Sequence, residues 1–556
     1  MKISLIKLFI LITIVVGMLA CGGKKNVDLI LYNGIVYTVD NAFSVAEAIA
    51  IRKGQIYRVG KTEDILEEFT SSQMIDLEGK AVYPGFIDAH CHFYGYATDL
   101  MKCNLTGTNS FEEALQRMIE FEKTNDFSWL LARGWDQNDW TEKEFPTKEM
   151  LDSLFPEKPV FALRIDGHAV LCNSKALEIA GITSSTKIFG GEILMKDGAL
   201  TGLLLDNAVD IVKNKIPAFS REEIDNSLIR AEQNCFEHGI TTVTDAGLGK
   251  DSIEHIYSLQ KDGRLKMRVY AMVSDNDEAR KYFLKRGPLK AERLTVRALK
   301  MYADGALGSR GACLKKDYAD QPGHRGFLLH TLANMEEIAD EALENGFQLC
   351  THAIGDSAAE TVLKLYSRHL STENNKRWRL EHCQVMSPKD MKMLGSYGII
   401  PSVQPTHATS DMYWAEKRLG PVKIKHAYAY KDIMIAAENM IALGTDFPVE
   451  DISPIMTFYA ATQRKDLAGF PEKGFLKENA LKRKDALRGM TIWAAYANFE
   501  EDEKGSIEEG KFADLVVLDR DILDISGDEI PATKVMFTIV AGEVVFSRLM
   551  PSQLNQ

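Results

Sequence analysis

The sequence has 556 residues, of which 45% are hydrophobic and 26% charged, and its formal net charge is −13 at neutral pH. This composition is typical of a globular protein of two to four domains. The acidic balance argues against a surface that binds nucleic acid or anionic lipid through bulk positive charge.

The first twenty residues differ from the rest of the chain. Lys2 and Lys7 precede an apolar run from Leu8 to Val16, and the segment ends at the small residue Ala20. A positively charged start, a hydrophobic run too short to span a bilayer and a small residue at the end predict a cleaved signal peptide over 1–20.

Cys21 follows this segment directly and precedes Gly22 and Gly23, which resembles the lipobox of bacterial lipoproteins. The resemblance implies that the Cys21 thiol carries a diacylglycerol, which anchors the protein to a membrane with the folded part facing the periplasm. The alternative is a plain cleaved signal with an incidental cysteine. The other seven cysteines are odd in number and include no CxxC pair, so we expect free thiols.

Short β-rich runs occupy both ends of the chain after the signal. In 27–82 they are separated by the turn dipeptides Asn33-Gly34 and Lys53-Gly54, and similar runs recur in 505–550. Because edge strands need partners, we expect 27–82 and 505–550 to form one composite β-sandwich domain that flanks residues 83–504.

The stretch Tyr83–His92 reads YPGFIDAHCH and predicts a buried strand that begins after Pro84 and Gly85. Side chains alternate along a strand, so His90 and His92 point to the same side, about 6 to 7 Å apart. Two imidazoles at a rigid strand end can hold one metal ion. Taken alone, the pair is equally compatible with two hydrogen-bonded core histidines.

Eight apolar, β-branched strand candidates alternate with helical patterns, which predicts a (β/α)8 barrel over 83–504. They lie at 85–92, 239–246, 267–274, 295–303, 347–353, 379–383, 398–404 and 440–447. The first connection is far longer than a barrel unit needs, so we expect an inserted α/β subdomain at about 103–215. Its first helix is predicted from Phe111, after a capping box of Ser110 and Glu113.

Catalytic groups of such barrels lie at the carboxyl ends of the strands. The residues found there are His90, His92, Lys300, His352, His382 and Asp446. Lys300 would bury an ammonium among apolar neighbours, which costs several kcal/mol unless it is paired or neutralised. Reaction of the neutral amine with carbon dioxide would give a carbamate that can bridge two metals; the alternative is a salt bridge to Asp304.

The motifs PGFIDAHCH, LKMYADGALGSRGA, THAIGD, LEHC and LGTDFPVE together resemble the amidohydrolase superfamily, in its family 3 branch that contains N-substituted formamide deformylases. The resemblance runs from about 27 to 548 and implies a distorted barrel, a flanking β-sandwich and one or two divalent metals, usually zinc. It implies His90 and His92 on the first metal, His352 and His382 on the second, and a carboxylated Lys300 between them. Asp446 would bind metal and move protons.

The chemistry that this set suggests is hydrolysis of a C–N bond of a small amide, N-formyl or N-acyl compound. A metal lowers the pKa of a bound water toward about 7 and polarises the carbonyl, and Asp446 would act as general base and then acid. Candidate substrate residues are Asp166 and His168 in the insertion, together with Trp135, Asp304, Arg310 and His407.

Three alternatives stay open at this point. The same metal centre could open a cyclic amide or lactone, or deaminate a heterocycle, as dihydropyrimidinase-type enzymes and deaminases do. The protein could also be a membrane-anchored binding lipoprotein without turnover, although a pure binder has no need of His382 or Asp446. Homo-oligomer formation is compatible with the sequence.

Overall fold

The computed structural model describes residues 24–549 except 138, 166, 168, 189–190 and 309. The expected signal peptide at 1–20, Cys21, Asp166 and His168 lie outside the described residues. The chain divides into two compact units: one joins the part up to Phe93 to the part from Glu232 onward, and the other is Tyr94–Ala231. No helix within these described ranges is long and apolar enough to cross a bilayer.

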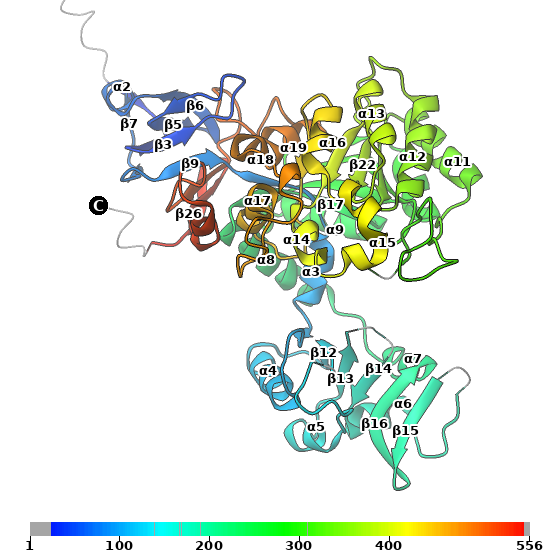
Figure 1. The fold of residues 1–556 in the computed structure, drawn as a ribbon. Coiled ribbons are helices and arrows are strands. Elements are labelled where there is room, and N and C mark those ends of the chain that lie inside the picture. Colours follow the sequence, from blue (N-terminus) through cyan, green and yellow to red (C-terminus); the bar gives the residue numbers. More distant parts are fainter. Residues whose placement is uncertain are drawn as a thin grey trace, which may run out of the picture. The chain divides into compact units, whose positions relative to one another are not determined.

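Eight parallel strands of the first unit form a nearly closed barrel (Figure 1). In sheet order they are β10 (Phe86–Cys91), β17 (Ile240–Leu248), β18 (Arg268–Ser274), β20 (Leu294–Tyr302), β21 (Gln348–Ala353), β22 (Arg379–His382), β23 (Ile400–Val403) and β24 (Ala442–Leu443). The residues after β24 return to the first strand: Asp446 N–H donates to His90 O, and His92 N–H donates to Phe447 O, both at 2.8 Å. The barrel predicted from strand and helix alternation is therefore present.

Helices follow most of these strands (Figure 1). They are α9 (Lys250–Lys261), α10 (Asp277–Leu284), α11 (Leu332–Glu344), α12 (Asp356–His369), α13 (Pro388–Ser396), α14 (Pro405–Asp411), α15 (Ala415–Lys423), α16 (Tyr430–Ala436), α17 (Pro454–Gln463), α18 (Arg483–Gly489) and α19 (Ile492–Ala497). Side-chain caps start several of them, as Ser387 does for α13 by accepting the N–H of Asp390.

Strands from the two chain ends pair beside the barrel. A six-stranded sheet has the order β27 (Glu543–Ser547), β26 (Val535–Val540), β25 (Leu515–Leu518), β9 (Ala81–Pro84), β3 (Ile35–Tyr37) and β4 (Val45–Ala46). A four-stranded sheet has the order β6 (Gln55–Gly60), β5 (Ala48–Arg52), β2 (Leu29–Tyr32) and β8 (Met74–Asp76). One buried cluster takes residues from both sheets, including Leu31, Ile49, Val82 and Leu515.

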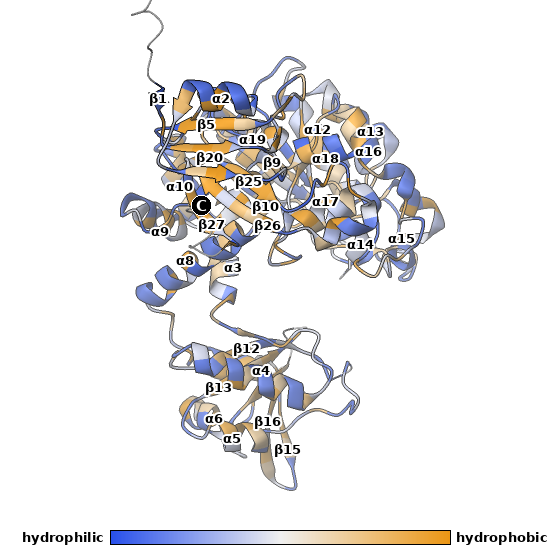
Figure 2. Ribbon diagram, turned by 90° about the vertical axis from the view of Figure 1, so that its left-hand side faces the viewer, coloured by the Kyte–Doolittle hydropathy of each residue, from blue (hydrophilic) through white to orange (hydrophobic). Residues whose placement is uncertain are grey.

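This arrangement leads directly into the barrel. Strand β9 ends at Pro84 and β10 begins at Phe86, so the turn at Gly85 joins the flanking sheet to the strand that carries His90. Figure 2 shows β5, β25 and β10 as hydrophobic strands, whereas the outer helix α9 is hydrophilic. Both β9 and β10 are buried throughout, so the hydrophobic effect holds the chain in place on both sides of the turn.

The second unit has its own core. Its sheet has the order β11 (Cys103–Asn104), β12 (Leu130–Trp135), β13 (Val160–Arg164), β14 (Ala169–Cys172), β16 (Ala199–Asp206) and β15 (Gly191–Lys196). Helix α4 (Phe111–Thr124) begins at the predicted cap, where Ser110 accepts the N–H of Glu113. The unit starts and ends outside the expected limits of 103–215. The seven cysteines of the described residues are free thiols.

Candidate metal centre

Five of the six predicted metal ligands line one cavity of about 350 Å³ at the carboxyl ends of the barrel strands: His92, Lys300, His352, His382 and Asp446. The sixth, His90, is fully buried, with Nε2 3.2 Å from Lys300 Nζ. Parallel strands of a barrel open on one face. Residues far apart in the sequence therefore converge here.

Asp446 lies between imidazoles on both sides. Its Oδ1 is 3.1 Å from His92 Nε2 and 3.7 Å from His90 Nε2, and its Oδ2 is 3.5 Å from His407 Nε2. Burial favours the neutral carboxyl, but the hydrogen bond from His92 and the nearby imidazoles outweigh it and hold the pKa of Asp446 well below its usual range. The φ of Asp446 is 66°, an uncommon value for a residue other than glycine and one that recurs at functional sites. Asp446 is thus an ionised, tightly placed carboxylate.

Lys300 is buried without an ion pair among the residues that the structure describes. Its Nζ lies 3.2 Å from His90 Nε2 and 4.8 Å from the centre of the Tyr302 ring. Burial lowers the pKa of the Lys300 amine, although Glu381 and Asp446 oppose this effect. The alternative salt bridge to Asp304 is not formed, because the Asp304 carboxylate accepts the N–H groups of Cys313, Ile354 and Gly355 instead.

Two of the histidines predicted as ligands are oriented by residues that the sequence analysis did not select. Glu381 Oε2 lies 2.5 Å from His90 Nδ1, and Gln404 Oε1 lies 2.7 Å from His382 Nδ1. An acceptor on Nδ1 fixes the proton there and leaves Nε2 with a free lone pair. Glu381 lies within the motif LEHC and could have been considered, but no pattern in the sequence points to Gln404.

Asp88 connects the first barrel strand by hydrogen bonds to the segment that follows the last strand. Its Oδ1 accepts the N–H groups of His90 and Thr445, and its Oδ2 accepts the hydroxyl of Thr445 at 2.6 Å. Gly444 allows this approach, since a Cβ there would lie 2.5 Å from His90 N. These contacts hold the strand of His90 against the segment of Asp446.

The donor set fits a divalent cation. His352 Nε2 and His407 Nε2 are buried and neither accept nor donate a hydrogen bond among the described residues. His90, His92 and Asp446 present ligand atoms within 4.8 Å of one another. Imidazole nitrogen and carboxylate oxygen are ligands of zinc and of other divalent metals. A cation would satisfy these unpaired atoms.

Comparison with known proteins identifies the family. Residues 73–546 match the model of the amidohydrolase family. The chain belongs to the amidohydrolase family. This amidohydrolase is 31% identical over 542 residues to Protein LONG AFTER FAR-RED 3 of Arabidopsis thaliana. The aligned region covers 93% of this chain and 91% of that protein.

One further relative and one solved structure are similar to this amidohydrolase over nearly its whole length. It is 28% identical over 564 residues to an N-substituted formamide deformylase of Arthrobacter pascens, covering 94% of this chain and 98% of that protein. The solved structure of an uncharacterized metal-dependent hydrolase from Pyrococcus horikoshii superposes with a TM-score of 0.74 at 27% identity, covering 90% of this chain and 99% of that one. The protein is a metal-dependent hydrolase of this family.

The predicted substrate residues of the amidohydrolase lie in different surroundings. His407 lines the cavity beside Asp446. Asp304 is fully buried and, as described above, binds three backbone N–H groups, and Arg310 pairs with Asp320 at 2.9 Å. Trp135 belongs to the second unit, where its ring is buried and its N–H donates to Ala162 O.

The rest of the cavity wall comes from residues that the sequence did not suggest. Besides the metal-facing donors it is lined by Tyr302, Ala306, Leu307, Gly308, Ile354, Gln384, Asp411, Trp414, Val449 and Glu450. A cavity of this size, with both apolar and polar side chains in its wall, suits a small molecule.

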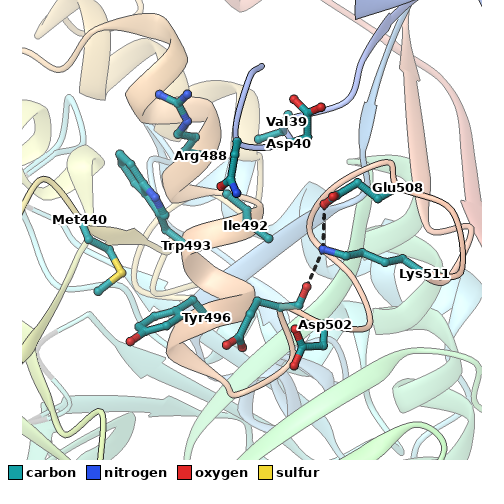
Figure 3. Close-up of a pocket in the computed structure, with 12 residues that line it drawn as sticks. Val39, Asp40, Met440, Arg488, Ile492, Trp493, Tyr496, Asp502, Glu508 and Lys511 are labelled. Atoms are coloured by element: carbon teal, nitrogen blue, oxygen red, sulfur yellow. Dashed lines mark hydrogen bonds and ion pairs between the residues drawn. The ribbon is translucent and has the colours of Figure 1, made fainter. Parts of the chain in front are cut away.

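A larger cavity of about 690 Å³ lies elsewhere in the same unit, lined by residues such as Asp40, Trp493, Tyr496 and Lys511 (Figure 3). Several of its charged groups are already engaged: Lys511 pairs with Glu508 at 3.0 Å and donates to Glu501 O, and Asp40 binds Ser44. We therefore place the chemistry of the amidohydrolase in the smaller cavity, where the metal donors gather.

Proposed function

We propose that the protein hydrolyses a C–N bond of a small amide, N-formyl or N-acyl compound, with water as the second substrate, to give a carboxylate and an amine. The observation that carries this proposal is the buried Asp446 carboxylate, set between imidazoles in the wall of a cavity that admits a small molecule. The likeness to an N-substituted formamide deformylase over nearly the whole chain supports it.

In the proposed reaction each residue has a defined task. His90, His92, His352, His382 and Asp446 would hold the divalent metal, which we expect to be zinc. When bound, such an ion lowers the pKa of a water molecule and polarises the substrate carbonyl. Asp446 would take a proton from the attacking water and return it to the leaving nitrogen, as base and then acid. Its pKa, held well below the usual range, keeps Asp446 ionised, which is the form that can take a proton.

We also propose that Lys300 is carboxylated. A neutral amine attacks carbon dioxide to give a carbamate and releases one proton, and burial favours the neutral amine of Lys300. The product would be an anion beside His90, able to bridge two ions. Elemental analysis of metal per chain tests this proposal: about two zinc equivalents, reduced by Lys300→Ala, is expected. One equivalent that Lys300→Ala leaves unchanged would contradict the bridge.

A substrate screen tests the proposed reaction. N-formyl and N-acyl amines should be hydrolysed by the metal-loaded protein, and release of formate or another carboxylate would be measured. Dihydropyrimidines and aminated heterocycles are the matched alternatives, because the same donors serve cyclic amidases and deaminases. Turnover of ring substrates alone would replace the proposal. Binding without turnover in metal-loaded protein would favour a binding lipoprotein.

We propose further that residues 1–20 are a signal peptide and that acylated Cys21 anchors the protein on the periplasmic side of a membrane. The two flanking sheets would be the composite β-sandwich of 27–82 and 505–550. Fractionation of cells that express the full chain checks the anchor: the protein should sediment with membranes, and Cys21→Ser should release it. Release of the wild type would exclude acylation.

A further inference from the structure

His382, His407 and Asp446 form a second group of donors beside the group of His90, His92 and Asp446. Their ligand atoms lie within 4.8 Å of one another, and all three side chains are more than nine-tenths buried. His407 Nε2 has no hydrogen-bond partner among the described residues. Buried polar atoms are nearly always satisfied, so this group calls for a partner that the protein itself does not supply.

Two glutamine amides decide the tautomers of the two imidazoles near Asp446, His382 through its Nδ1 and His407 through its Nδ1. Gln404 presents its oxygen to His382 Nδ1, so His382 keeps a lone pair on Nε2. Gln384 is turned the other way: its Nε2 lies 2.9 Å from His407 Nδ1, while its Oε1 is buried without a hydrogen-bond partner. This orientation places the proton of neutral His407 on Nε2. That atom is 3.5 Å from Asp446 Oδ2, too far for a good hydrogen bond.

Half a turn of the Gln384 amide removes this mismatch. Its Oε1 would then accept Nδ1–H of His407, and the turn needs no other movement because the two ends of an amide have nearly the same size. His407 Nε2 would present a lone pair to the ionised carboxylate of Asp446. Two such acceptors at 3.5 Å repel each other unless a cation lies between them.

We propose that His407 is a ligand of the metal centre and that Gln384 holds it in the ligand tautomer. A second cation would be held by His382 and His407 and would share Asp446 with the first. The family resemblance implies His352 and His382 at that position, and it leaves His407 to the substrate pocket. The proposal requires only that the centre binds a divalent cation, so it holds for any substrate of the enzyme.

Metal binding to chelator-treated full-length protein tests the proposal without any substrate. Co²⁺ would be titrated by calorimetry and by its visible absorption, for wild type and for His407→Ala. If two Co²⁺ ions bind per chain, we expect His407→Ala to bind the weaker of the two at least about tenfold less tightly. If one Co²⁺ ion binds, we expect the same loss of affinity for that ion. His369→Ala is the matched control, because His369 ends α12 and pairs with Asp340 at 2.9 Å. Unchanged Co²⁺ binding by His407→Ala would overturn the proposal.

The Gln384 amide gives a second test that leaves all ligands in place. Gln384→Met removes the acceptor of the His407 proton and should lower the affinity for the same Co²⁺ ion. Gln384→Glu retains an acceptor and should preserve that affinity. X-ray absorption of the zinc-loaded proteins counts imidazoles per ion: the count should fall in His407→Ala and in Gln384→Met. If His407 instead donates to Asp446, neither change alters the imidazole count, and the proposal is wrong. Circular dichroism identifies variants that have lost the fold.

Discussion

Glu381 holds His90 from the side opposite to the cavity ligands: its Oε2 lies 2.5 Å from His90 Nδ1, and its Oε1 lies 2.7 Å from Arg379 Nε. All three side chains are fully buried. Burial alone would raise the pKa of Glu381, but the charge of Arg379 and the hydrogen bond from His90 hold it well below its usual range. The carboxylate therefore stays ionised and fixes the His90 proton on Nδ1, which leaves Nε2 for a metal.

This relationship predicts the effect of removing Glu381. Glu381→Ala should lower metal affinity by about 10–100-fold, because His90 loses its orienting partner. It should also lower the free energy of unfolding by about 3–5 kcal/mol, since Arg379 would remain buried without its acid. Titration of metal into chelator-treated protein and denaturant unfolding measure the two effects. Glu381→Gln keeps an acceptor for Nδ1–H and should retain more affinity than Glu381→Ala; equal affinities would contradict the orienting role.

Asp446→Asn should abolish turnover and spare the fold. The amide keeps the shape of the carboxylate but neither accepts a proton from water nor returns one to nitrogen, and general acid–base catalysis contributes about 10²–10⁴-fold. The measurement is kcat on a hydrolysed amide together with the thermal unfolding midpoint. Loss of both activity and folding would leave catalysis unresolved for this variant alone, so metal content is determined on the same preparation. Activity near that of the wild type would remove Asp446 from the mechanism.

Gly444→Ala should disturb the metal centre through the backbone. A Cβ at this position would lie 2.5 Å from His90 N and 2.8 Å from Asp88 Oδ1. Overpacking of this kind costs about 1–3 kcal/mol, and here it would push apart the strands that carry His90 and Asp446. Both the free energy of unfolding and the metal affinity should fall. Gly249→Ala is the control, because a Cβ there meets no atom within 4 Å.

The raised pKa of Glu232 predicts that the free energy of unfolding depends on pH, independently of the metal centre. Burial raises its pKa to about 7, although its carboxylate accepts the N–H groups of Lys266 and Met267. The unfolded value is about 4.3. Between these pH values the folded protein binds a proton that the unfolded chain has released. This contribution to stability is therefore complete below about pH 4 and is lost as the pH rises through about 7.

Denaturant unfolding at pH 5 and pH 7.5 checks this sign. The wild type should lose up to about 1.4 kcal/mol per pH unit from this one group across the window. Glu232→Gln, which does not titrate, should reduce the difference between the two pH values. A variant with the same pH dependence as the wild type would show that another group is responsible.

Strand ends were predictable from local pattern. The apolar runs that carry His90, Lys300 and His352 end where the structure ends its strands, give or take two residues, because a buried parallel strand must be apolar almost throughout. A polar residue at the end of such a run is therefore conspicuous in the sequence alone. The same reasoning found the cap at Ser110, because a capping side chain and its helix are local neighbours.

Partners across the barrel were not predictable in this way. Three pairs come into contact only after the strands are paired: Glu381 with His90, Gln384 with His407, and Asp88 with Thr445. The sequence around each of these residues does not indicate which residue its partner is. Asp304 illustrates the reverse case. Its motif suggested the substrate pocket, but the fold surrounds its carboxylate with three backbone N–H groups.

The sequence by itself determined the alternation of strands and helices and the kinds of donor at the strand ends, because hydrophobic periodicity and residue chemistry are local properties. Only the tertiary structure decided which oxygen of Asp446 faces which imidazole and which nitrogen of each histidine is free. Those relations depend on barrel closure at Gly444 and on buried hydrogen bonds between distant residues. Distances of a few ångströms between such residues are set by packing, which no local pattern encodes.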